Sequence, residues 1–245
     1  MRTLVLSDLH SNLEAMSSVL ADARRRGFDR SVVLGDIVGY GASPNEVVEL
    51  VRALGPEFVV RGNHDKVACG ITDGESFNDP AREAALWTRE ALTPDCLDYL
   101  QHLAQGPLDA GGFLISHGAP LDEEDYLLGY TDAEANFDQL GFDVALFGHT
   151  HFACLFELTG GRPRLMMLAG DEGSYTFRPG ARYLVNPGSV GQPRDHNPNA
   201  SYLVLDSDAA RIEWHRVPYD IAEAQSKIAD AGLPDVLWQR LSLGV

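Results

Sequence analysis

Five short motifs rich in aspartate and histidine lie at the ends of short apolar runs in this chain. Apolar runs of this length are typical of buried strands, so the polar residues at their ends fall on loops at one edge of a sheet. Since the motifs are far apart in the sequence, the fold must bring several strand ends together. In chain order the motifs are SDLHSN, LGDIVGYG, RGNHD, ISHGAP and FGHTH.

The motifs supply nitrogen and oxygen donors that suit divalent metal ions. The candidate ligands are Asp8, His10, Asp36, Asn63, His117, His149 and His151. A carboxylate such as that of Asp36 has two oxygens and can bridge two cations about 3.5–4 Å apart. A mixed set of imidazole, carboxylate and amide donors favours Mn, Fe, Co, Ni or Zn over Ca or Mg alone. The sequence therefore predicts two divalent transition-metal ions as cofactors.

His64 follows Asn63 directly in the motif RGNHD. Neighbouring side chains of an extended segment face opposite ways, so we expect His64 to point away from the metals. We predict that His64 donates a proton to the leaving oxygen of a phosphate ester, and that Asp65 or a backbone carbonyl orients its ring. A hydroxide that bridges the two metals would be the nucleophile, because bound cations allow water to ionise near neutral pH.

The balance of charges limits the partners of the chain. Its 245 residues include 36 acidic and 19 basic ones, which gives a net charge of −17. No basic stripe is visible, so binding to nucleic acid is disfavoured. A small phosphorylated molecule is the better-matched partner, because bound cations reverse the local charge. The sequence does not indicate an oligomeric partner.

Cysteine usage and hydropathy bear on location. Cys69, Cys96 and Cys154 form no C-x-x-C pair, which favours reduced thiols and a cytoplasmic protein. The first residues already contain a strand and a metal motif, so no signal peptide is expected. No apolar run approaches the roughly 20 residues of a membrane-spanning helix, so we expect no contact with a membrane.

Strands and helices alternate in the first part of the hydrophobic pattern, which is typical of a parallel or mixed sheet with helices on its faces. We expect strands at 3–6, 31–36, 58–64, 113–118 and 144–151, and helices at 12–26, 44–54, 79–92 and 94–104. One capping box is expected at Ser43 and Glu46, and another at Thr131 and Glu134 before a further helix. Residues 66–110 contain no convincing strand, and we expect them to form a helical insertion over the sheet edge.

After residue 152 the chain contains short segments of alternating apolar and polar residues at close intervals. Alternating segments predict antiparallel strands of a second sheet at 153–158, 164–168, 182–185, 201–206 and 211–217. Residues 220–245 are expected to form one or two closing helices. No linker or internal repeat interrupts the chain, so we expect residues 1–245 to form a single domain.

Taken in order, the five motifs resemble the signature of the calcineurin-like metallophosphoesterase superfamily, which runs D-x-H, G-D, G-N-H-D/E, a single His and G-H-x-H. The resemblance spans residues 3 to about 195. It implies an α/β (α+β) fold, a four-layer αββα sandwich of two mixed β-sheets flanked by helices, with a binuclear metal site at one edge and His64 as the general acid. The implied ligands are Asp8, His10, Asp36 and His151 for the first metal, and Asp36 again, Asn63, His117 and His149 for the second.

One motif departs from the serine/threonine protein phosphatases of the superfamily, in which it reads G-D-x-V-D-R-G. Here Gly39 and Tyr40 occupy the positions of that Asp and Arg, so the chain resembles the small prokaryotic phosphodiesterase-type branch more closely. The stretch NPGSVGQPRD at 186–195 also resembles a loop of small prokaryotic members. Arg194 in this loop either contacts the substrate phosphate or forms a salt bridge within the loop.

Aromatic residues are a second candidate feature for substrate binding. Tyr40, Trp87, Tyr126 and Tyr130 can line the pocket and stack on a base. Aromatic residues at helical spacing are more often part of a core, and we expect this of Trp87.

The sequence thus predicts a metal-dependent phosphoesterase that hydrolyses a small phosphodiester or phosphomonoester, with nucleotide-derived esters among the candidates. A serine/threonine-type protein phosphatase and a dinucleoside polyphosphate hydrolase are alternatives within the superfamily. A nuclease is disfavoured by the acidic charge. A non-catalytic scaffold with the same fold is an alternative of another class, because fold does not imply function.

Overall fold

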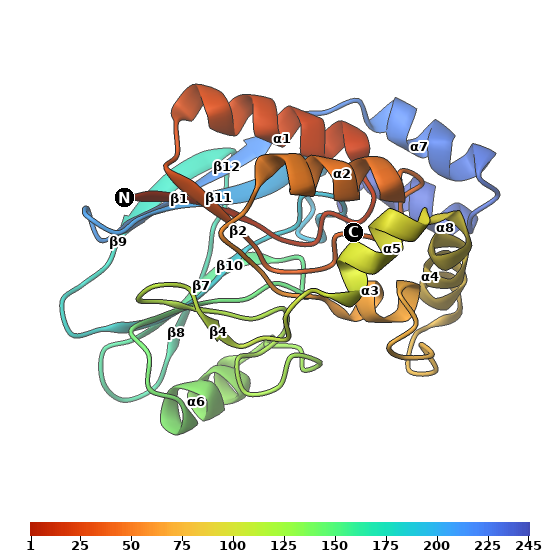
Figure 1. The fold of residues 1–245 in the computed structure, drawn as a ribbon. Coiled ribbons are helices and arrows are strands. Elements are labelled where there is room, and N and C mark those ends of the chain that lie inside the picture. Colours follow the sequence, from red (N-terminus) through yellow and green to blue (C-terminus); the bar gives the residue numbers. More distant parts are fainter.

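The structure, a computed structural model, describes residues 1–245 and contains two six-stranded mixed sheets with helices around them (Figure 1). The first sheet has the order β3 (Phe58–Val59), β2 (Arg30–Val33), β1 (Arg2–Leu6), β11 (Ala200–Asp206), β12 (Arg211–Val217) and β9 (Glu172–Thr176). The second has the order β4 (Leu108–Asp109), β5 (Leu114–Ile115), β6 (Val144–Leu146), β10 (Arg182–Pro187), β7 (Ala153–Leu158) and β8 (Arg164–Met167). The predicted α/β fold of two mixed sheets flanked by helices is confirmed.

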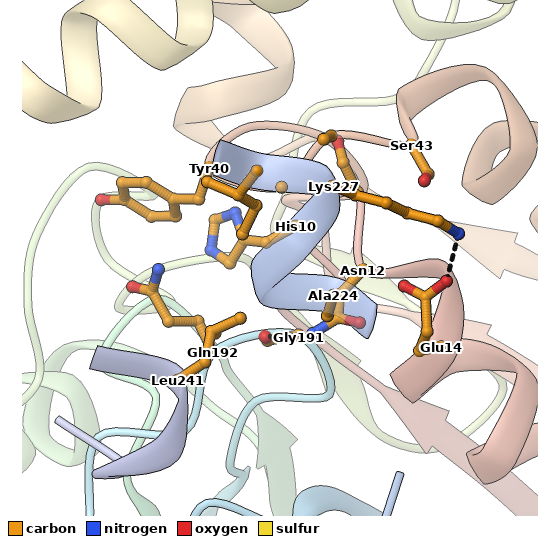
Figure 2. Close-up of a pocket in the computed structure, with 14 residues that line it drawn as sticks. His10, Asn12, Glu14, Tyr40, Ser43, Gly191, Gln192, Ala224, Lys227 and Leu241 are labelled. Carbon is orange, nitrogen blue, oxygen red and sulfur yellow. Dashed lines mark hydrogen bonds and ion pairs between the residues drawn. The ribbon is translucent and has the colours of Figure 1, made fainter. Parts of the chain in front are cut away.

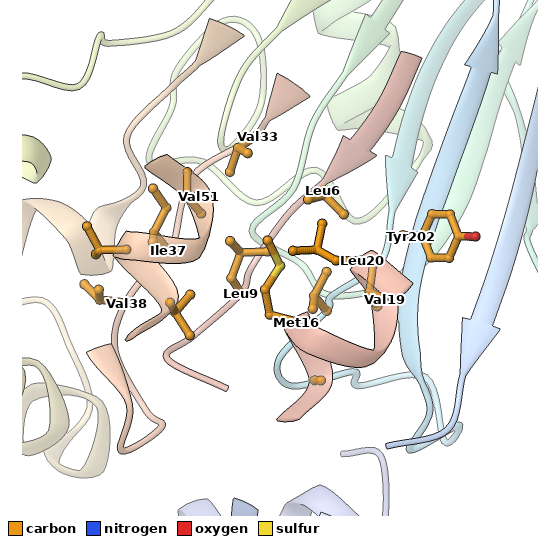
Figure 3. Packing of buried hydrophobic residues seen from close by; sticks show 14 of the residues in the cluster. Leu6, Leu9, Met16, Val19, Leu20, Val33, Ile37, Val38, Val51 and Tyr202 are labelled. Atoms are coloured by element: carbon orange, nitrogen blue, oxygen red, sulfur yellow. The ribbon is translucent and has the colours of Figure 1, made fainter. Parts of the chain in front are cut away.

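Three layers of apolar side chains hold these elements together. The largest cluster lies between the first sheet and the helices α1 (Leu13–Arg26) and α2 (Pro44–Leu54) (Figure 3). A second cluster fills the space between the two sheets. A third lies between the second sheet and α6 (Tyr130–Gln139). The layers therefore follow the order helix, sheet, sheet, helix.

Both faces of β1 are apolar because the strand lies between two of these layers. Leu4 and Leu6 belong to the cluster beneath α1, and Val5 belongs to the cluster between the sheets. Successive side chains of a strand point to opposite faces, so alternate residues enter different layers. A short, continuously apolar run is therefore the pattern expected of this strand.

Parallel pairing places the ends of several strands at one edge. In the first sheet β1 pairs in parallel with β2, and β2 pairs in parallel with β3. In the second sheet β6 pairs in parallel with both β5 and β10. Parallel strands run in the same direction, so their carboxyl ends lie at the same edge of the sheet. The loops that carry the aspartate and histidine motifs leave from these ends.

Several strands end earlier than the hydrophobic pattern predicts. The strand predicted at 31–36 ends at Val33, and the one predicted at 58–64 contains only the two residues of β3. Residues Asn63–Ala68 instead form a short helix, α3, which begins where Asp65 accepts a hydrogen bond from the Gly62 amide at 2.9 Å. A carboxylate at this position satisfies an amide that would otherwise lack a partner, and this favours the helix.

The C-terminal strands do not form a sheet of their own, so that prediction is wrong. β11 pairs antiparallel with β1, and β12 and β9 extend the same sheet, whereas β7, β8 and β10 join β6. β9 was not predicted, because its sequence EGSYT is short and polar. An alternating pattern shows which face of a strand is buried but does not specify the partner strand.

Helices account for most of the segment between β3 and β4. α4 (Asp79–Ala91) and α5 (Pro94–Gln101) follow α3, which confirms the helices predicted there, although the short strand β4 also falls within 66–110.

Neither predicted capping box forms. Ser43 makes no side-chain bond to α2, and at α6 it is Asp132 that accepts the amide of Gly129 at 2.9 Å. α7 (Ile221–Asp230), α8 (Asp235–Gln239) and a short 3₁₀ turn, η1 (Arg240–Ser242), close the chain.

A buried carboxylate connects α1 to the first sheet. Asp22 on α1 accepts a hydrogen bond from the Tyr202 hydroxyl on β11 at 2.6 Å and another from Arg26 Nε at 2.8 Å. Burial alone would favour the neutral acid, but the Tyr202 hydroxyl and the Arg26 guanidinium hold the pKa of Asp22 below its ordinary value. The carboxylate is therefore ionised in the folded protein and fixes α1 against the sheet.

The variant Asp22→Asn is expected to lose about 1–3 kcal/mol of unfolding free energy near neutral pH, the size of a hydrogen bond to a charged group. A carboxyl with a depressed pKa stabilises the fold above its unfolded pKa of about 3.9, and this stabilisation is lost as the pH falls. The difference between the two proteins should therefore shrink in acid. Urea unfolding at several pH values measures it, with the exposed Asp138→Asn as control. An equal difference at every pH would contradict this account.

Candidate metal centre

Residues from both sheets meet in one buried pocket. Asp8 and His10 follow β1, Asp36 follows β2, and the His149–His151 segment follows β6. Asn63 begins α3, and His117 follows β5. The structure brings together all seven residues that the motifs predict, and each is at most 9% exposed. The parallel pairing described above is what places their loops at a common edge.

The donor atoms form two groups that share one carboxylate. One group contains Asp8, His10, Asp36 and His151, and the other contains Asp36, His117 and His149, with the donor atoms of each group within 4.8 Å of one another. Asp36 Oδ2 lies 3.6 Å from His10 Nε2 and 3.4 Å from His117 Nε2. Asp36 therefore belongs to both groups and would be a shared ligand if each group held a cation.

Asn63 completes the second group. Its Oδ1 lies 3.0 Å from His117 Nε2, and His117 Nε2 lies 3.1 Å from His149 Nδ1. An amide oxygen donates electrons to a cation but adds no negative charge. The pocket therefore contains two carboxylates, one amide and four imidazoles around a common centre.

Backbone carbonyls fix the orientation of three imidazoles. His10 Nδ1 lies 3.1 Å from the Val38 carbonyl, and His117 Nδ1 lies 2.8 Å from the Leu34 carbonyl. His151 Nδ1 lies 2.6 Å from the Gln192 carbonyl. A carbonyl only accepts, so each ring carries its proton on Nδ1 and presents Nε2 to the pocket. This arrangement is typical of histidines that bind metals.

Two nitrogen lone pairs face each other as a result. His10 Nε2 and His151 Nε2 are 3.1 Å apart, and in neutral rings both of these nitrogens are acceptors. Burial lowers the pKa of both rings well below the ordinary value, so a proton between them is disfavoured. A cation relieves this repulsion, and the residues present therefore fit a bound metal.

The ligand loops have an unusual backbone. Nine non-glycine residues have a positive φ, and Asp8, His10, Asp36, His149 and His151 are five of them. This conformation costs of order 1–3 kcal/mol for each residue and persists only where the surrounding structure enforces it. The strain is therefore concentrated where the chain turns ligands into the pocket.

The ionisable groups affect one another strongly. Burial raises the pKa of Asp8 to about 7, and the nearby Asp36 charge acts in the same direction. Burial disfavours the charged form of His117, but the Asp36 carboxylate outweighs it and raises the pKa of His117 to about 9. Burial and the His117 charge lower the pKa of His149 to about 3. Metal ligands must be deprotonated, so cations compete with protons chiefly at Asp8 and His117.

His64 lies beside the two groups and is not among their donor atoms. Its buried ring packs against Tyr40, Phe77 and His10, with ring centroids 4.3, 4.6 and 5.0 Å away. The predicted contact with Asp65 is absent, because the Asp65 oxygens accept the amides of Val38 and Gly62. His64 Nδ1 has no hydrogen-bond partner. Packing alone therefore orients this ring, and its burial lowers its pKa to about 4.

The two predicted substrate-binding residues lie next to the ligands. Tyr40 packs on His10 with ring centroids 4.6 Å apart, and Figure 2 shows these two rings together with Gln192. Arg194 lies over the Tyr40 ring at 5.6 Å and donates to Gln192 Oε1 at 3.0 Å. Arg194 forms no salt bridge, so the loop salt bridge considered from the sequence is absent. Its guanidinium charge remains free of a carboxylate.

The other aromatic candidates divide between pocket and core. Tyr126 stacks on the ring of His149 with centroids 3.9 Å apart and is 50% exposed. Trp87 packs against the small cluster formed by α4, α7 and α8, as expected for a core residue. Tyr130 lines a separate hollow beside Arg164.

Sequence reasoning missed the residues that support the ligand loops. Asn186 Nδ2 donates to the Gly148 carbonyl at 2.8 Å and to Thr150 Oγ1 at 3.0 Å. Ser189 Oγ donates to the Asp8 carbonyl at 2.8 Å. Both residues lie in the stretch NPGSVGQPRD, which was noted only for Arg194. The polar residues of that stretch at the end of an apolar strand were the available signal.

Comparison with known proteins supports one family. The family model described as calcineurin-like phosphoesterase superfamily domain matches residues 1–210. An uncharacterized protein of Methanocaldococcus jannaschii is 40% identical over 98% of this chain and 97% of its own length. The crystal structure of a metallophosphoesterase from Sphaerobacter thermophilus is 40% identical, covers 100% of both chains and has a TM-score of 0.88. A symmetrical bis(5'-nucleosyl)-tetraphosphatase of Sodalis glossinidius is 35% identical over only 33% of this chain and 29% of its own length.

Two further observations concern the helices and the cysteines. None of its helices is both long enough and apolar enough to cross a lipid bilayer. Cys69, Cys96 and Cys154 are all buried and unpaired, as the sequence predicts.

Replacement of the shared carboxylate is expected to remove both metals. After loading with Mn²⁺ and dialysis, the protein should retain two ions, Asp36→Ala none, and His149→Ala or His151→Ala one, because each of these histidines belongs to one group. Plasma mass spectrometry measures the metal content. The exposed histidine variant His102→Ala is the matched control and should retain two. Retention of two ions by Asp36→Ala would contradict a shared ligand.

Proposed function

Because the chain belongs to the calcineurin-like phosphoesterase superfamily, we propose that it hydrolyses a small phosphodiester or phosphomonoester at a pair of divalent transition-metal ions. The observation that carries the proposal is the pair of donor groups that share Asp36. Manganese is the first metal to test among Mn, Fe, Co, Ni and Zn, all of which suit this mixture of donors.

Each donor group has a defined role in this proposal. Asp8, His10, Asp36 and His151 would hold one ion, and Asp36, Asn63, His117 and His149 would hold the other. Such ions polarise a phosphoryl oxygen and lower the pKa of water when they are bound. The carbonyls behind His10, His117 and His151 keep the imidazole nitrogens directed at the pocket before any ion arrives. The site is therefore organised in advance, which reduces the reorganisation needed during the reaction.

His64 is the proposed donor of a proton to the leaving oxygen. Its ring lies against Tyr40 at the edge of the donor groups, and it makes no bond that would hold it in another role. In the protein without metal ions or ester its pKa is about 4, because burial disfavours the charged ring. The negative charge of a bound phosphate favours the imidazolium, so the substrate itself brings His64 closer to the protonated form.

The structure supports a phosphoesterase of small molecules over a protein phosphatase. Gly39 has a φ of +92°, and a Cβ atom added there would lie 2.5 Å from His64 Nδ1. An aspartate at position 39, as in the protein phosphatases, does not fit this backbone. The partial match to a dinucleoside tetraphosphatase covers a third of the chain, so cleavage of dinucleoside polyphosphates is the second candidate.

The remaining alternatives have less support. A scaffold has no need of the complete donor set, whereas all seven ligands and His64 are present here. A nuclease would need a basic groove for a polyanion, and the net charge of −17 opposes one. We therefore propose a small phosphorylated substrate, and we place the protein in the cytoplasm because its three cysteines are unpaired thiols.

Bis-p-nitrophenyl phosphate is expected to be cleaved when Mn²⁺ is added to the metal-free protein, with release of p-nitrophenolate followed by its absorbance. A chelator should abolish the activity, and readdition of metal should restore it. The variant His102→Ala serves as the matched control and should behave like the wild type. Absence of turnover with every divalent transition metal, at neutral and mildly alkaline pH, would refute the proposed function.

The role of His64 predicts a dependence on the leaving group. General acid catalysis contributes about 10²–10⁴-fold when the leaving oxygen needs a proton, so His64→Gln should lower kcat/KM by this factor on thymidylyl-thymidine. The same variant should lose far less on bis-p-nitrophenyl phosphate, because p-nitrophenolate leaves without a proton. Both rates are compared with those of His102→Gln. Equal losses on the two substrates would show that His64 is not the acid.

A further inference from the structure

A cleft of about 360 Å³ lies beside the proposed metal centre. Its lining includes Tyr40, Tyr126, Asn78, Arg194 and Arg240. Two of these residues contact the ligands directly, since Tyr40 packs on His10 and Tyr126 stacks on His149. The cleft therefore adjoins the place where a phosphate ester would be cleaved, and a group attached to that ester can extend into it.

The cleft contains two cationic side chains that pair with no aspartate or glutamate. Neither Arg194 nor Arg240 forms a salt bridge with an acidic side chain, although the chain has an excess of them. Arg194 donates one bond to Gln192 Oε1, and its buried Nε has no partner. Arg240 donates from Nε to a backbone oxygen of Val245, which also lines the cleft, and its two Nη groups have no acceptor in the protein.

The positive charge of Arg194 is close enough to Arg240 to affect its pKa. Partial burial and the charge of Arg194 both lower the pKa of Arg240, and the opposing effect of Tyr40 is smaller. Two like charges that line one partly buried cleft repel each other, and an anion bound between them reduces this repulsion. Guanidinium groups bind phosphate oxygens through paired hydrogen bonds, so a phosphoryl group matches the vacant donors.

The cleft depends on the C-terminal segment of the chain. Arg240 opens the turn η1, and its neighbour Leu241 lines a small cavity together with His10, Tyr40 and Gln192 (Figure 2). The family match ends at residue 210, so Arg240 lies outside the part that this chain shares with the superfamily domain. A residue supplied from outside the common domain is suited to set specificity without altering the metal ligands.

We propose, on the premise of the phosphoesterase function, that Arg194 and Arg240 form a second anion subsite and that the substrate carries two phosphoryl groups. One phosphoryl group is the ester cleaved beside His64, and the other is held in the cleft by the two guanidiniums. The substrate class is thus a bisphosphorylated ester, such as a nucleotide with two phosphates on different oxygens. Tyr126, which lines the cleft and is half exposed, offers an aromatic face to the group between them.

Two chromogenic substrates that differ only in the second phosphate test this proposal. They are thymidine 5′-(p-nitrophenyl phosphate) and the same ester with a 3′-phosphate. A hydrogen bond to a charged group stabilises a complex enough to change its affinity about tenfold or more. The kcat/KM of the wild type should therefore be at least about tenfold higher for the 3′-phosphorylated ester than for the ester without this phosphate. Arg240→Gln should bring the ratio close to one, whereas the exposed arginine variant Arg24→Gln should retain the wild-type ratio.

A second variant keeps the test valid if Arg240→Gln does not fold. Arg240→Lys retains the charge but not the fork of donors, so it should show a reduced preference that remains above one. Calorimetry gives a separate readout, in which thymidine 3′,5′-bisphosphate should bind more tightly than thymidine 5′-phosphate to the wild type. This difference should disappear in the Arg240→Gln variant, or decrease in Arg240→Lys.

The outcomes separate this proposal from the one on which it rests. A wild-type ratio near one, or an unchanged ratio in the Arg240 variants, overturns the subsite while leaving the phosphoesterase function intact. Absence of p-nitrophenolate release from both thymidine esters and from bis-p-nitrophenyl phosphate instead overturns the function itself.

Discussion

The carboxylate of Asp36 is the interaction on which the arrangement of the pocket depends. Its Oδ2 lies within 3.6 Å of histidines that follow strands of different sheets, and its Oδ1 accepts the amide of His64 at 2.9 Å. One buried anion therefore positions ligands from the first sheet, a ligand from the second sheet and the start of α3. Gly62 permits this close approach, because a Cβ atom at that position would collide with the carboxylate. Removal of this charge would leave several buried donors without a common partner.

Asp8 joins the two sheets in a similar way. Its Oδ1 accepts the amide of His149 at 3.1 Å, so the loop after β1 is tied to the loop after β6. The stretch after β10 adds further bonds through Asn186 and Ser189. Strained backbone persists only where surrounding contacts enforce it, and these bonds supply such contacts. The packed sandwich beneath the pocket thus holds in place loops that would relax to ordinary conformations in isolation.

The ligands and most of the strands could be predicted from the sequence, but the pairing of the strands and the conformation of the ligand loops could not. The ligands Asp8 and His151 could be identified because metal-binding residue types follow apolar runs, and a run such as that of β1 is buried on both faces. The pairing of β11 with β1 could not be predicted, because alternation does not name a partner strand. The helix at Asn63 and the positive φ at Asp36 escaped prediction because both depend on contacts with distant loops.

The acidic net charge of the chain explains why the arginine in the C-terminal segment is important for binding a phosphorylated molecule. A protein with a net charge of −17 repels phosphorylated molecules at long range, so attraction must come from groups inside the pocket. Bound cations would provide it at the ester, but they distinguish poorly between one phosphate compound and another. Arg194 and Arg240 pair with no acidic side chain and line a partly buried cleft, where a second anion gains more than it would at the surface. Selectivity and catalysis can therefore be carried by different parts of the same chain.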